Sequence, residues 1–575
     1  MMTIKKIIII SVILLISNIV YADQISKKSK SSFYLEEATI QSIQSAIKNK
    51  EITCEQLVNA YIERIKLYNL SVNQNAPLNA IAVINLNALD QARVLDQSFA
   101  KGQMKGSLFC IPIVLKDNID SYDSTSSSGS MSLLGNQPTK DAFITTQLRN
   151  AGAIILGKST MDEFASGTSG ISSANGRIGN AYDTSKNPGG SSGGSAVAVS
   201  VNFTTLGIGT DNSGSVRIPA ALNGIYGLRP TFGLISQTGI FPRGNMDGTA
   251  GPMARNVEDL AILLDVIAKP DILDKKSLNI NRPKSYTVYL DKNSLQGKRI
   301  GIVTQLGFMN TFAGMPESTR QIILQTLQKM QTFGVMIIPK IQLVNYDLNR
   351  AYNEAGEKED VNGYLAAYPS VRKNYQDICE SNRTTVFGDT KACLNFINYL
   401  PKKDSSEYKT ALQIFTRNKN YVEKVMKQND LDALLIPVNS TGSATYDSST
   451  FSNETLASNA GLPGITINLG YTTENMPIGF ELIGKSFDEG LLISLAYAYE
   501  KNMPERKIPL LPEKNVAIQT LAIAEYNNLL TEIGYSAYEK ILSHSSNMKF
   551  SKDLTPDKFQ FIVEEKLKQS GVYQD

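Results

Sequence analysis

The chain has 575 residues, 42% of them hydrophobic and 19% charged, a composition typical of a folded globular protein and unlike that of a disordered one. Its net charge of +3 provides no strong basic field, so no nucleic-acid partner is expected. The sequence has one histidine, His544, which excludes a multi-histidine metal site, and we expect neither a metal nor a cofactor.

The first 22 residues have the pattern of an export signal. Two lysines form a basic start, residues 7–20 are nearly all aliphatic, and the segment ends at Ala22, a small residue of the kind that signal peptidases read. The apolar run is shorter than the ~20 residues that a membrane-spanning helix usually needs. We therefore expect a signal peptide over 1–22, a mature N-terminus at Asp23, no stable membrane span, and export to the periplasm or beyond the cell. An uncleaved membrane anchor is the alternative.

The N-terminal third alternates between helical and strand patterns. Apolar residues at helical spacing predict helix over 35–68, where Thr53 is an expected N-cap with Gln56 three residues later, as in a capping box. The next predicted elements are a strand at 80–84, a helix at 88–100, a strand at 111–115, a helix at 142–150 and a strand at 153–156. This alternation favours an α/β sheet protein.

The composition changes sharply between residues 187 and 229. Residues 189–195 are too rich in glycine and serine to form a packed element, whereas the small apolar residues of 196–201 predict a buried helix. Residues 206–210 predict a tight buried strand, and a second Gly/Ser turn follows at 211–215. Two such turns joined by a buried helix and strand are typical of an active site, because flexible linkers lack an apolar middle.

The remaining chain continues the α/β pattern. The predicted elements are a helix at 257–267, a strand at 299–303, a mostly helical region at 315–430, strands at 434–438, 464–469 and 478–483, and a helix at 490–500. We expect one large domain over 23–511, followed by a C-terminal helical extension over 512–575.

The chain has four cysteines and no Cys-x-x-Cys spacing, which excludes a zinc ribbon. Cys379 and Cys393 lie close together in a polar, helical stretch, and we predict that they form a disulfide, as an oxidising compartment permits. Cys110 lies in the apolar run 108–115 and is expected in the core.

A hydrolytic serine needs a proton acceptor, because a free hydroxyl is a weak nucleophile at neutral pH. His544 lies in a polar tail, where a histidine is usually just solvated. Residues 190–194 fit the G-x-S-x-G elbow of serine–histidine hydrolases, but the polar residues 183–188 before them cannot form the hydrophobic strand that an elbow requires.

Lys116 is the other candidate base. It ends the apolar run 111–115, so its stem is anchored in the core, and burial can lower the pKa of a lysine into the working range. The alternative is a lysine that simply reaches solvent at a strand end.

Three segments, in matching order and spacing, resemble the amidase-signature family. They are VLKDN at 114–118, PGGSSGGS at 188–195 and GTDNSGSVRIPA at 209–220, the last continuing as GIYGLRPT at 224–231. Weaker resemblance covers about residues 35–510, and peptide-amidase-like members look nearest. The resemblance implies an α/β amidase-signature fold, with a central twisted mixed β-sheet flanked by helices on both sides.

The resemblance also implies the chemistry: hydrolysis of carboxylic amide bonds through an acyl-enzyme, with a small-molecule or peptide amide as substrate. Ser215 corresponds to the nucleophile, Lys116 to the base, and Ser191, in a cis peptide, to the residue that relays the proton between them. The implied oxyanion hole consists of backbone N–H groups of the second Gly/Ser turn, at 211–215. These are the N–H groups of Asn212, Ser213, Gly214 and Ser215.

Further residues have supporting roles in this interpretation. Ser192 is expected to support the lysine–serine network, or else simply to form the turn, while Asp211 and Arg217 hold the nucleophile turn in shape. Ser213 replaces a glycine that many family members have, so its side chain narrows the pocket and bears on acyl specificity. The segments 164–170 and 315–430 are expected to border the pocket.

Residues 152–159 match the phosphate-binding pattern GxxxxGK[ST]. The four intervening residues, Ala-Ile-Ile-Leu, form a strand pattern themselves, so we expect a strand followed by a turn and no nucleotide site.

Two other functions share these motifs. The A subunit of a tRNA-dependent amidotransferase works in the cytosol with partner subunits, and the signal segment argues against it. A catalytically silent scaffold has no need of Lys116, so the presence of all three triad residues argues against that interpretation.

Overall fold

The computed structural model describes residues 33–70, 77–244, 247–349, 354–439, 441–444, 453, 455–503 and 506–511. The predicted signal peptide, the C-terminal extension over 512–575 and His544 lie outside these residues. Among the helices that are described, none combines the length and the apolar character needed to cross a membrane.

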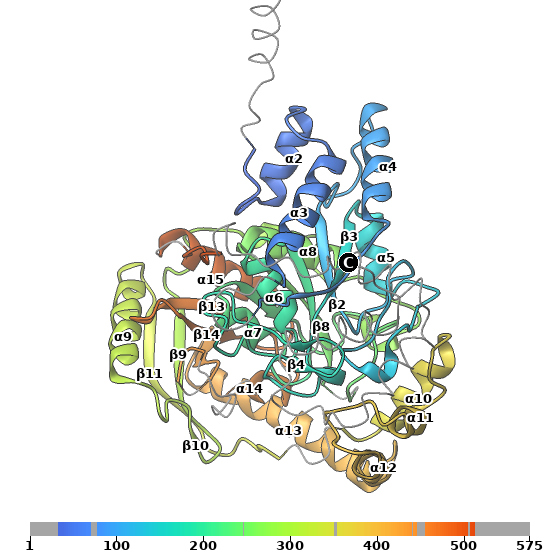
Figure 1. The fold of residues 1–575 in the computed structure, drawn as a ribbon. Helices are drawn as coiled ribbons and strands as arrows, with labels where there is room; N and C mark the ends of the chain where they lie inside the picture. Colours follow the sequence, from blue (N-terminus) through green and yellow to red (C-terminus); the bar gives the residue numbers. More distant parts are fainter. Residues whose placement is uncertain are drawn as a thin grey trace, which may run out of the picture.

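A 12-stranded sheet forms the centre of the described chain (Figure 1). The strands run in the order β1-β3-β2-β6-β8-β7-β13-β14-β12-β9-β10, and β11 pairs with β9. Parallel pairs such as β2 with β3 and β6 occur beside antiparallel pairs such as β6 with β8, so the sheet is mixed, as predicted.

The strand bounds are as follows. In chain order they are β1 (Ile81–Ile84), β2 (Pro112–Lys116), β3 (Ile154–Ser159), β6 (Leu206–Asp211), β7 (Tyr226–Arg229), β8 (Thr249–Ala254), β9 (Arg299–Leu306), β10 (Met309–Asn310), β11 (Met336–Leu343), β12 (Ala433–Pro437), β13 (Gly464–Tyr471) and β14 (Pro477–Ile483). A separate small sheet pairs β4 (Ile171–Ser172) with β5 (Gly176–Arg177).

Helices cover both faces of the sheet. They are α2 (Ile40–Lys48), α3 (Cys54–Tyr68), α4 (Ala88–Ala100), α5 (Phe143–Asn150), α6 (Gly193–Ser200), α7 (Arg217–Leu222), α8 (Val257–Ile267), α9 (Glu317–Thr332), α10 (Glu357–Ala367), α11 (Tyr375–Glu380), α12 (Thr390–Tyr399), α13 (Ser406–Gln428), α14 (Thr455–Ser458) and α15 (Glu489–Asn502). Helices α6, α7 and α13 pack on one face, and α8, α9 and α15 pack on the other.

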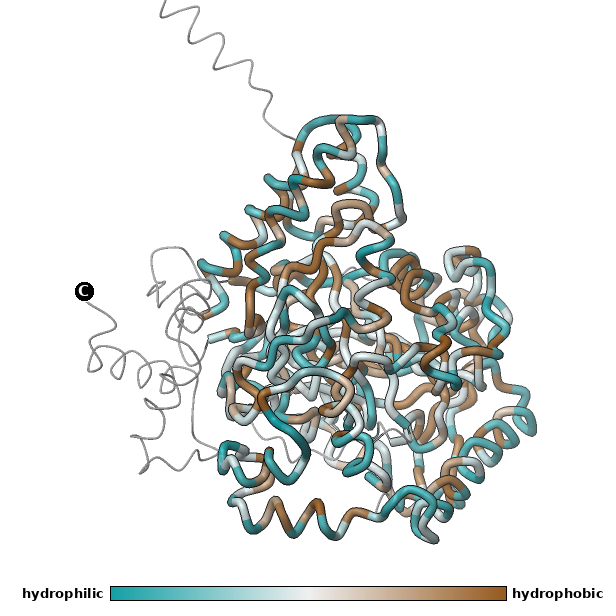
Figure 2. The backbone as a smooth tube through the Cα atoms, turned by 90° about the vertical axis from the view of Figure 1, so that its right-hand side faces the viewer, coloured by the Kyte–Doolittle hydropathy of each residue, from teal (hydrophilic) through white to brown (hydrophobic). Residues whose placement is uncertain are grey.

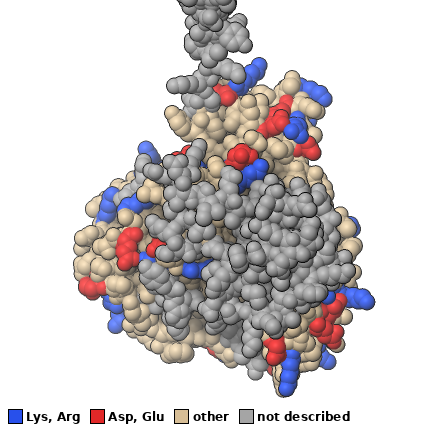
Figure 3. Space-filling view, in the orientation of Figure 1, with Lys and Arg blue, Asp and Glu red and all other residues tan. Residues whose placement is uncertain are grey.

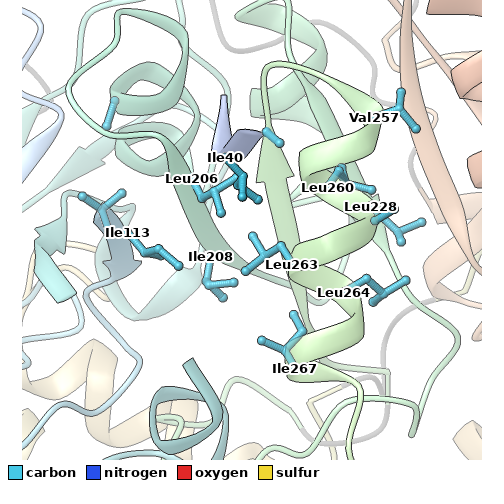
Figure 4. Packing of buried hydrophobic residues seen from close by; sticks show 14 of the residues in the cluster. Ile40, Ile113, Leu206, Ile208, Leu228, Val257, Leu260, Leu263, Leu264 and Ile267 are labelled. Atoms are coloured by element: carbon cyan, nitrogen blue, oxygen red, sulfur yellow. The ribbon is translucent and has the colours of Figure 1, made fainter. Parts of the chain in front are cut away.

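Strand alternation assigns each residue of β6 to a face, because successive side chains point to opposite sides. Leu206 and Ile208 pack against Leu263 and its neighbours on α8 (Figure 4). Gly207 and Gly209 face α6 instead, and a Cβ at Gly209 would lie 2.7 Å from the Ser192 hydroxyl oxygen. Glycine at these positions therefore lets the Gly/Ser segment approach the strand closely.

Helix α8 shows how the sequence produces the core. Asn256 caps its N-terminus by accepting a hydrogen bond from the Asp259 N–H, and acidic residues lie in its first turn. Its leucines at helical spacing pack onto the sheet, where each buried side chain contributes about 1.5–3 kcal/mol to the stability of the fold.

In Figure 2 the hydrophobic stretches lie mainly in the interior, and the outer turns are mostly hydrophilic.

Most predicted elements are present within a few residues of the expected bounds. The predicted helices at 88–100 and 257–267 coincide with α4 and α8, and Thr53 with Gln56 forms the expected capping box. Six of the described strands were not predicted. They are the two-residue strands β4, β5 and β10, the strands β7 and β8, and β11, which lies inside the mostly helical region 315–430.

Most of the phosphate-loop pattern is a strand, as expected, but β3 continues through Ser159, so the turn expected within the pattern is absent. Strand β3 includes Lys158, whose Nζ is buried, donates to Ser126 Oγ at 2.6 Å and lies 3.7 Å from an Asp117 carboxylate oxygen. The residues before Ser191 form a loop rather than a strand, which agrees with the rejection of a hydrolase elbow.

On the described surface in Figure 3, acidic and basic side chains are interspersed.

All four cysteines are paired. The predicted Cys379–Cys393 disulfide is present and joins α11 to α12. Cys110 is buried, as expected, but it also forms a disulfide with Cys54 at the start of α3, which was not predicted.

Candidate active site

Lys116 is the last residue of β2, and strand alternation directs its side chain to the face that α6 covers. The side chain is fully buried. Its Nζ lies 2.7 Å from Ser191 Oγ, 2.9 Å from Thr210 Oγ1 and 3.3 Å from the Thr210 carbonyl oxygen. The amine is thus held by three oxygen atoms, one of which belongs to a predicted catalytic serine.

Burial lowers the pKa of Lys116 from 10.5 to about 7, because the charged amine loses its hydration. The negative charges of Asp162 and Asp211 act in the opposite direction but do not cancel this effect. A lysine with this pKa is substantially neutral near neutral pH and can accept a proton, as the sequence interpretation requires.

The first Gly/Ser turn places Ser191 beside this amine. The Gly190–Ser191 peptide bond is cis, as the family resemblance implies. The Asp162 N–H donates to the Ser191 carbonyl oxygen at 3.1 Å, and Ser192 Oγ donates to the Thr210 carbonyl oxygen at 3.2 Å. Ser192 therefore ties the turn to the end of β6, next to Lys116.

The second turn carries Ser215 between β6 and α7. Ser215 is 5% exposed, and its carbonyl oxygen accepts a hydrogen bond from the Ser192 N–H at 3.1 Å, so the two Gly/Ser turns lie together. The Gly214 and Val216 N–H groups donate to the two carboxylate oxygens of Asp211, at 2.8 and 3.0 Å. Gly214 adopts a φ of +106°, which a glycine tolerates readily.

Asp211 belongs to a buried network of four charges. Arg217 pairs with Asp211 at 3.1 Å and also with Glu481 on β14, while Arg229 on β7 donates to Asp211 at 2.8 Å. The two arginines hold the pKa of Asp211 well below its usual value, against the effect of burial. Removing one member of such a network typically costs about 3–5 kcal/mol, because it leaves an uncompensated buried charge. The Asp211 carboxylate, paired with Arg217, thus holds the 211–215 turn through the Gly214 and Val216 N–H groups.

The structure places the Lys116 amine against the Ser191 hydroxyl, and the backbone hydrogen bond between Ser192 and Ser215 holds the two turns together. One expected oxyanion donor, the Gly214 N–H, is already used within the turn by Asp211. Asn212, the first residue after β6, anchors the turn through its side-chain amide, which donates to the Gly244 carbonyl oxygen at 2.9 Å.

Three residues that surround the Lys116 amine and the Ser191 turn were not predicted from the sequence. Thr210 contacts the lysine amine directly, and Asn118 donates to Thr210 Oγ1 at 3.2 Å. Asp162 is buried, and its carboxylate accepts from the Ser169 and Gly170 N–H groups. Two adjacent acidic residues, 162 and 163, begin three residues after the end of the buried strand β3, and they are the signal in the sequence that could have revealed Asp162.

The segment 164–170, expected to border the pocket, wraps around Asp162. Part of region 315–430 packs beside it, since α10, α11 and α12 form one hydrophobic cluster with Phe164 and Phe241. Helix α9 and strand β11 of the same region lie at the opposite end of the sheet (Figure 1).

The family model described as Amidase matches residues 56–493 of this chain. The A subunit of the Glutamyl-tRNA(Gln) amidotransferase from Caldanaerobacter subterraneus subsp. tengcongensis is 33% identical over 486 residues, which cover 80% of this chain and 96% of that protein. The protein of the same name from Coxiella burnetii is also 33% identical, over 81% of this chain and 98% of its own.

Solved structures give a similar result. The native peptide amidase of Stenotrophomonas maltophilia superimposes with a TM-score of 0.75 and 29% identity, covering 83% of this chain and 99% of that chain. An amidase family protein from Bacillus anthracis str. Ames gives a TM-score of 0.73 and 29% identity, covering 83% and 93%.

Proposed function

This chain belongs to the amidase family, and on that premise we propose that it hydrolyses linear carboxylic amides through Ser215, Ser191 and Lys116. One observation carries the proposal: the buried Lys116 amine, with its pKa lowered to about 7, lies 2.7 Å from the hydroxyl of Ser191. A neutral amine in that position is a base, and a serine beside it can pass on a proton.

In the proposed reaction, Ser215 Oγ attacks the carbonyl carbon of the amide. Its proton passes to Ser191 Oγ while the Ser191 proton moves to Lys116 Nζ, so the charge that develops on Ser215 is relieved during attack. The resulting oxyanion is stabilised by N–H groups of the 211–215 turn, with the exception of Gly214, whose N–H binds Asp211.

Collapse of the tetrahedral intermediate breaks the C–N bond. The leaving nitrogen takes a proton from Ser191, which Lys116 reprotonates, and the acyl group stays on Ser215. Water then attacks this ester with the same base and releases the acid, which restores the free enzyme.

The proposal predicts that the purified protein releases ammonia or an amine from at least one class of linear amide. The panel should contain C-terminally amidated peptides, fatty acid amides, anilides and free glutamine, each followed by product mass and ammonia release. Hydrolysis of an amidated peptide or acyl amide, with glutamine untouched, is expected. No turnover of any amide by a folded protein would contradict the proposal and favour a silent scaffold.

The second candidate is the A subunit of a tRNA-dependent amidotransferase, which the 33% identity to such subunits favours. Two features support an exported enzyme instead: the signal-like segment over residues 1–22 and the two disulfides, since disulfides are rare in cytosolic proteins. We propose that the protein is exported after cleavage of this segment.

The N-terminus of the natural protein distinguishes the two candidates. Mass spectrometry of protein from its own cells is expected to identify a mature chain that begins at Asp23, in the periplasmic or extracellular fraction. A full-length chain in the cytosol, co-purifying with other subunits and hydrolysing glutamine, would support the amidotransferase instead.

A further inference from the structure

Glu163 joins the active-site region to a distant part of the chain. It is buried and directly follows Asp162. One of its carboxylate oxygens accepts hydrogen bonds from the hydroxyls of Ser130 and Ser173, each at 2.7 Å. The other accepts from the Thr385 N–H at 2.9 Å, the Thr385 hydroxyl at 2.7 Å and the Val386 N–H at 3.1 Å. One oxygen therefore binds segments near β2 and β4, and the other binds the connection between α11 and α12.

That connection is closed covalently. The Cys379–Cys393 disulfide joins α11 to α12, and Thr385 and Val386 lie inside the loop that it closes. Phe387, in the same loop, stacks on Phe164 with ring centroids 5.8 Å apart. The loop thus contacts the active-site segment twice, through a carboxylate and through an aromatic ring.

The contacts continue from Glu163 to the proposed catalytic serine. Asp162 donates its N–H to the Ser191 carbonyl oxygen at 3.1 Å, and a Cβ at Gly190 would lie 2.1 Å from an Asp162 carboxylate oxygen. Asp162 therefore packs directly on the Gly190–Ser191 turn. Any displacement of Glu163 shifts Asp162, and with it the hydroxyl that faces Lys116.

We propose that Glu163 is a positioning residue, through which the disulfide-closed loop 379–393 holds Asp162 and the Ser191 turn in the geometry for proton transfer. The inference rests on the proposed function of Ser191. It adds that the α11–α12 connection, far from the triad in sequence, is part of the catalytic apparatus.

The test compares three variants of the full chain. Glu163→Ala removes the acceptor and is expected to lower kcat for amide hydrolysis by about 10²-fold with little change in KM, because a misplaced reacting group costs about that much. Glu163→Gln is expected to stay close to wild type, because its amide oxygen can still accept from Thr385 and Val386 while the two serine hydroxyls accept from its NH₂ group. The kcat of the double variant Cys379→Ser/Cys393→Ser is expected to lie between those of Glu163→Ala and Glu163→Gln.

Matched controls separate positioning from loss of stability. Glu489→Ala removes another buried carboxylate, one that belongs to α15 and accepts from the Thr231 N–H at 2.7 Å. Cys54→Ser/Cys110→Ser opens the other disulfide, beyond the end of β2 opposite Lys116. Both controls are expected to lower the melting temperature and leave kcat unchanged. Equal kcat in Glu163→Ala and Glu489→Ala, or a Glu163→Gln variant no better than the alanine variant, would overturn the proposal.

Hydrogen–deuterium exchange tests the same inference without a substrate. Peptides that cover 160–170 and 188–195 are expected to exchange faster in Glu163→Ala and in Cys379→Ser/Cys393→Ser than in wild type and both controls. Unchanged exchange there would refute the positioning role, whatever the activity. Absence of amide hydrolysis in the wild type, with the exchange difference present, would refute the proposed function alone.

Discussion

Replacement of Ser215 by alanine is expected to lower kcat/KM for amide hydrolysis by roughly 10⁴–10⁶-fold, the scale of loss when a hydrolase loses its nucleophile. Ser215 lies in a turn that the Asp211 carboxylate shapes through the Gly214 and Val216 N–H groups, and the turn contacts Ser192 directly. Nothing in this arrangement needs the Ser215 hydroxyl for folding. The melting temperature is therefore expected to change little, and initial rates with the best substrate of the panel provide the measurement.

A matched serine controls for the loss of a buried hydroxyl. Ser200 on α6 is fully buried and donates to the Asn223 carbonyl oxygen at 2.7 Å, away from Lys116. Ser200→Ala is expected to keep wild-type activity at some cost in stability. Full activity in Ser215→Ala, combined with inactivity in Ser191→Ala, would transfer the nucleophile role to Ser191.

The second large effect concerns Lys116 and pH. The base must be neutral, and the lowered pKa of Lys116 means that the neutral form predominates above about pH 7 and the ammonium form below it. The value of kcat/KM is therefore expected to rise with pH through about 7 and then level off. Below pH 7 it should fall by about tenfold per pH unit, since one proton inactivates the base.

Two substitutions sharpen this prediction. Lys116→Arg retains the positive charge but cannot deprotonate, so it is expected to be as inactive as Lys116→Ala, with losses of roughly 10⁴-fold or more. Lys276→Met is the control, because burial also lowers the pKa of Lys276, whose amine lies over the Phe232 ring. The control should keep the pH profile of the wild type. An unchanged profile in Lys116→Arg would show that another group is the base.

The sequence predicts those elements whose local signals agree with their tertiary setting. Helices α4 and α8 have apolar residues at helical spacing, and the bounds match. Strand β8 was missed because Gly251 and Pro252 are unusual in strands, yet a Cβ at Gly251 would lie 2.2 Å from the Leu228 carbonyl oxygen, so the strand packing requires glycine. Strand β11 was missed because it contains Pro339 and is largely exposed, as an edge strand can be.

The residues of the candidate site also fall into two groups, those that local motifs reveal and those that only the fold brings together. Lys116, Ser191 and Ser215 lie in motifs with a fixed order and spacing, so the resemblance selects them as candidate catalytic residues without a structure. Thr210 and Glu163 act through contacts between segments far apart in the sequence, and no local pattern encodes those contacts. The cysteines follow the same rule, since the neighbouring pair Cys379–Cys393 was predicted and the distant pair Cys54–Cys110 was not.

The most direct test of the proposed mechanism is to identify the acylated residue. Wild-type protein would be mixed with the best amide substrate, quenched in acid within the first turnover, digested and analysed by mass spectrometry. We expect an acyl adduct on Ser215 in wild type, which is absent from Ser215→Ala. An adduct on another residue, or turnover in Ser215→Ala at the wild-type rate, would contradict the mechanism.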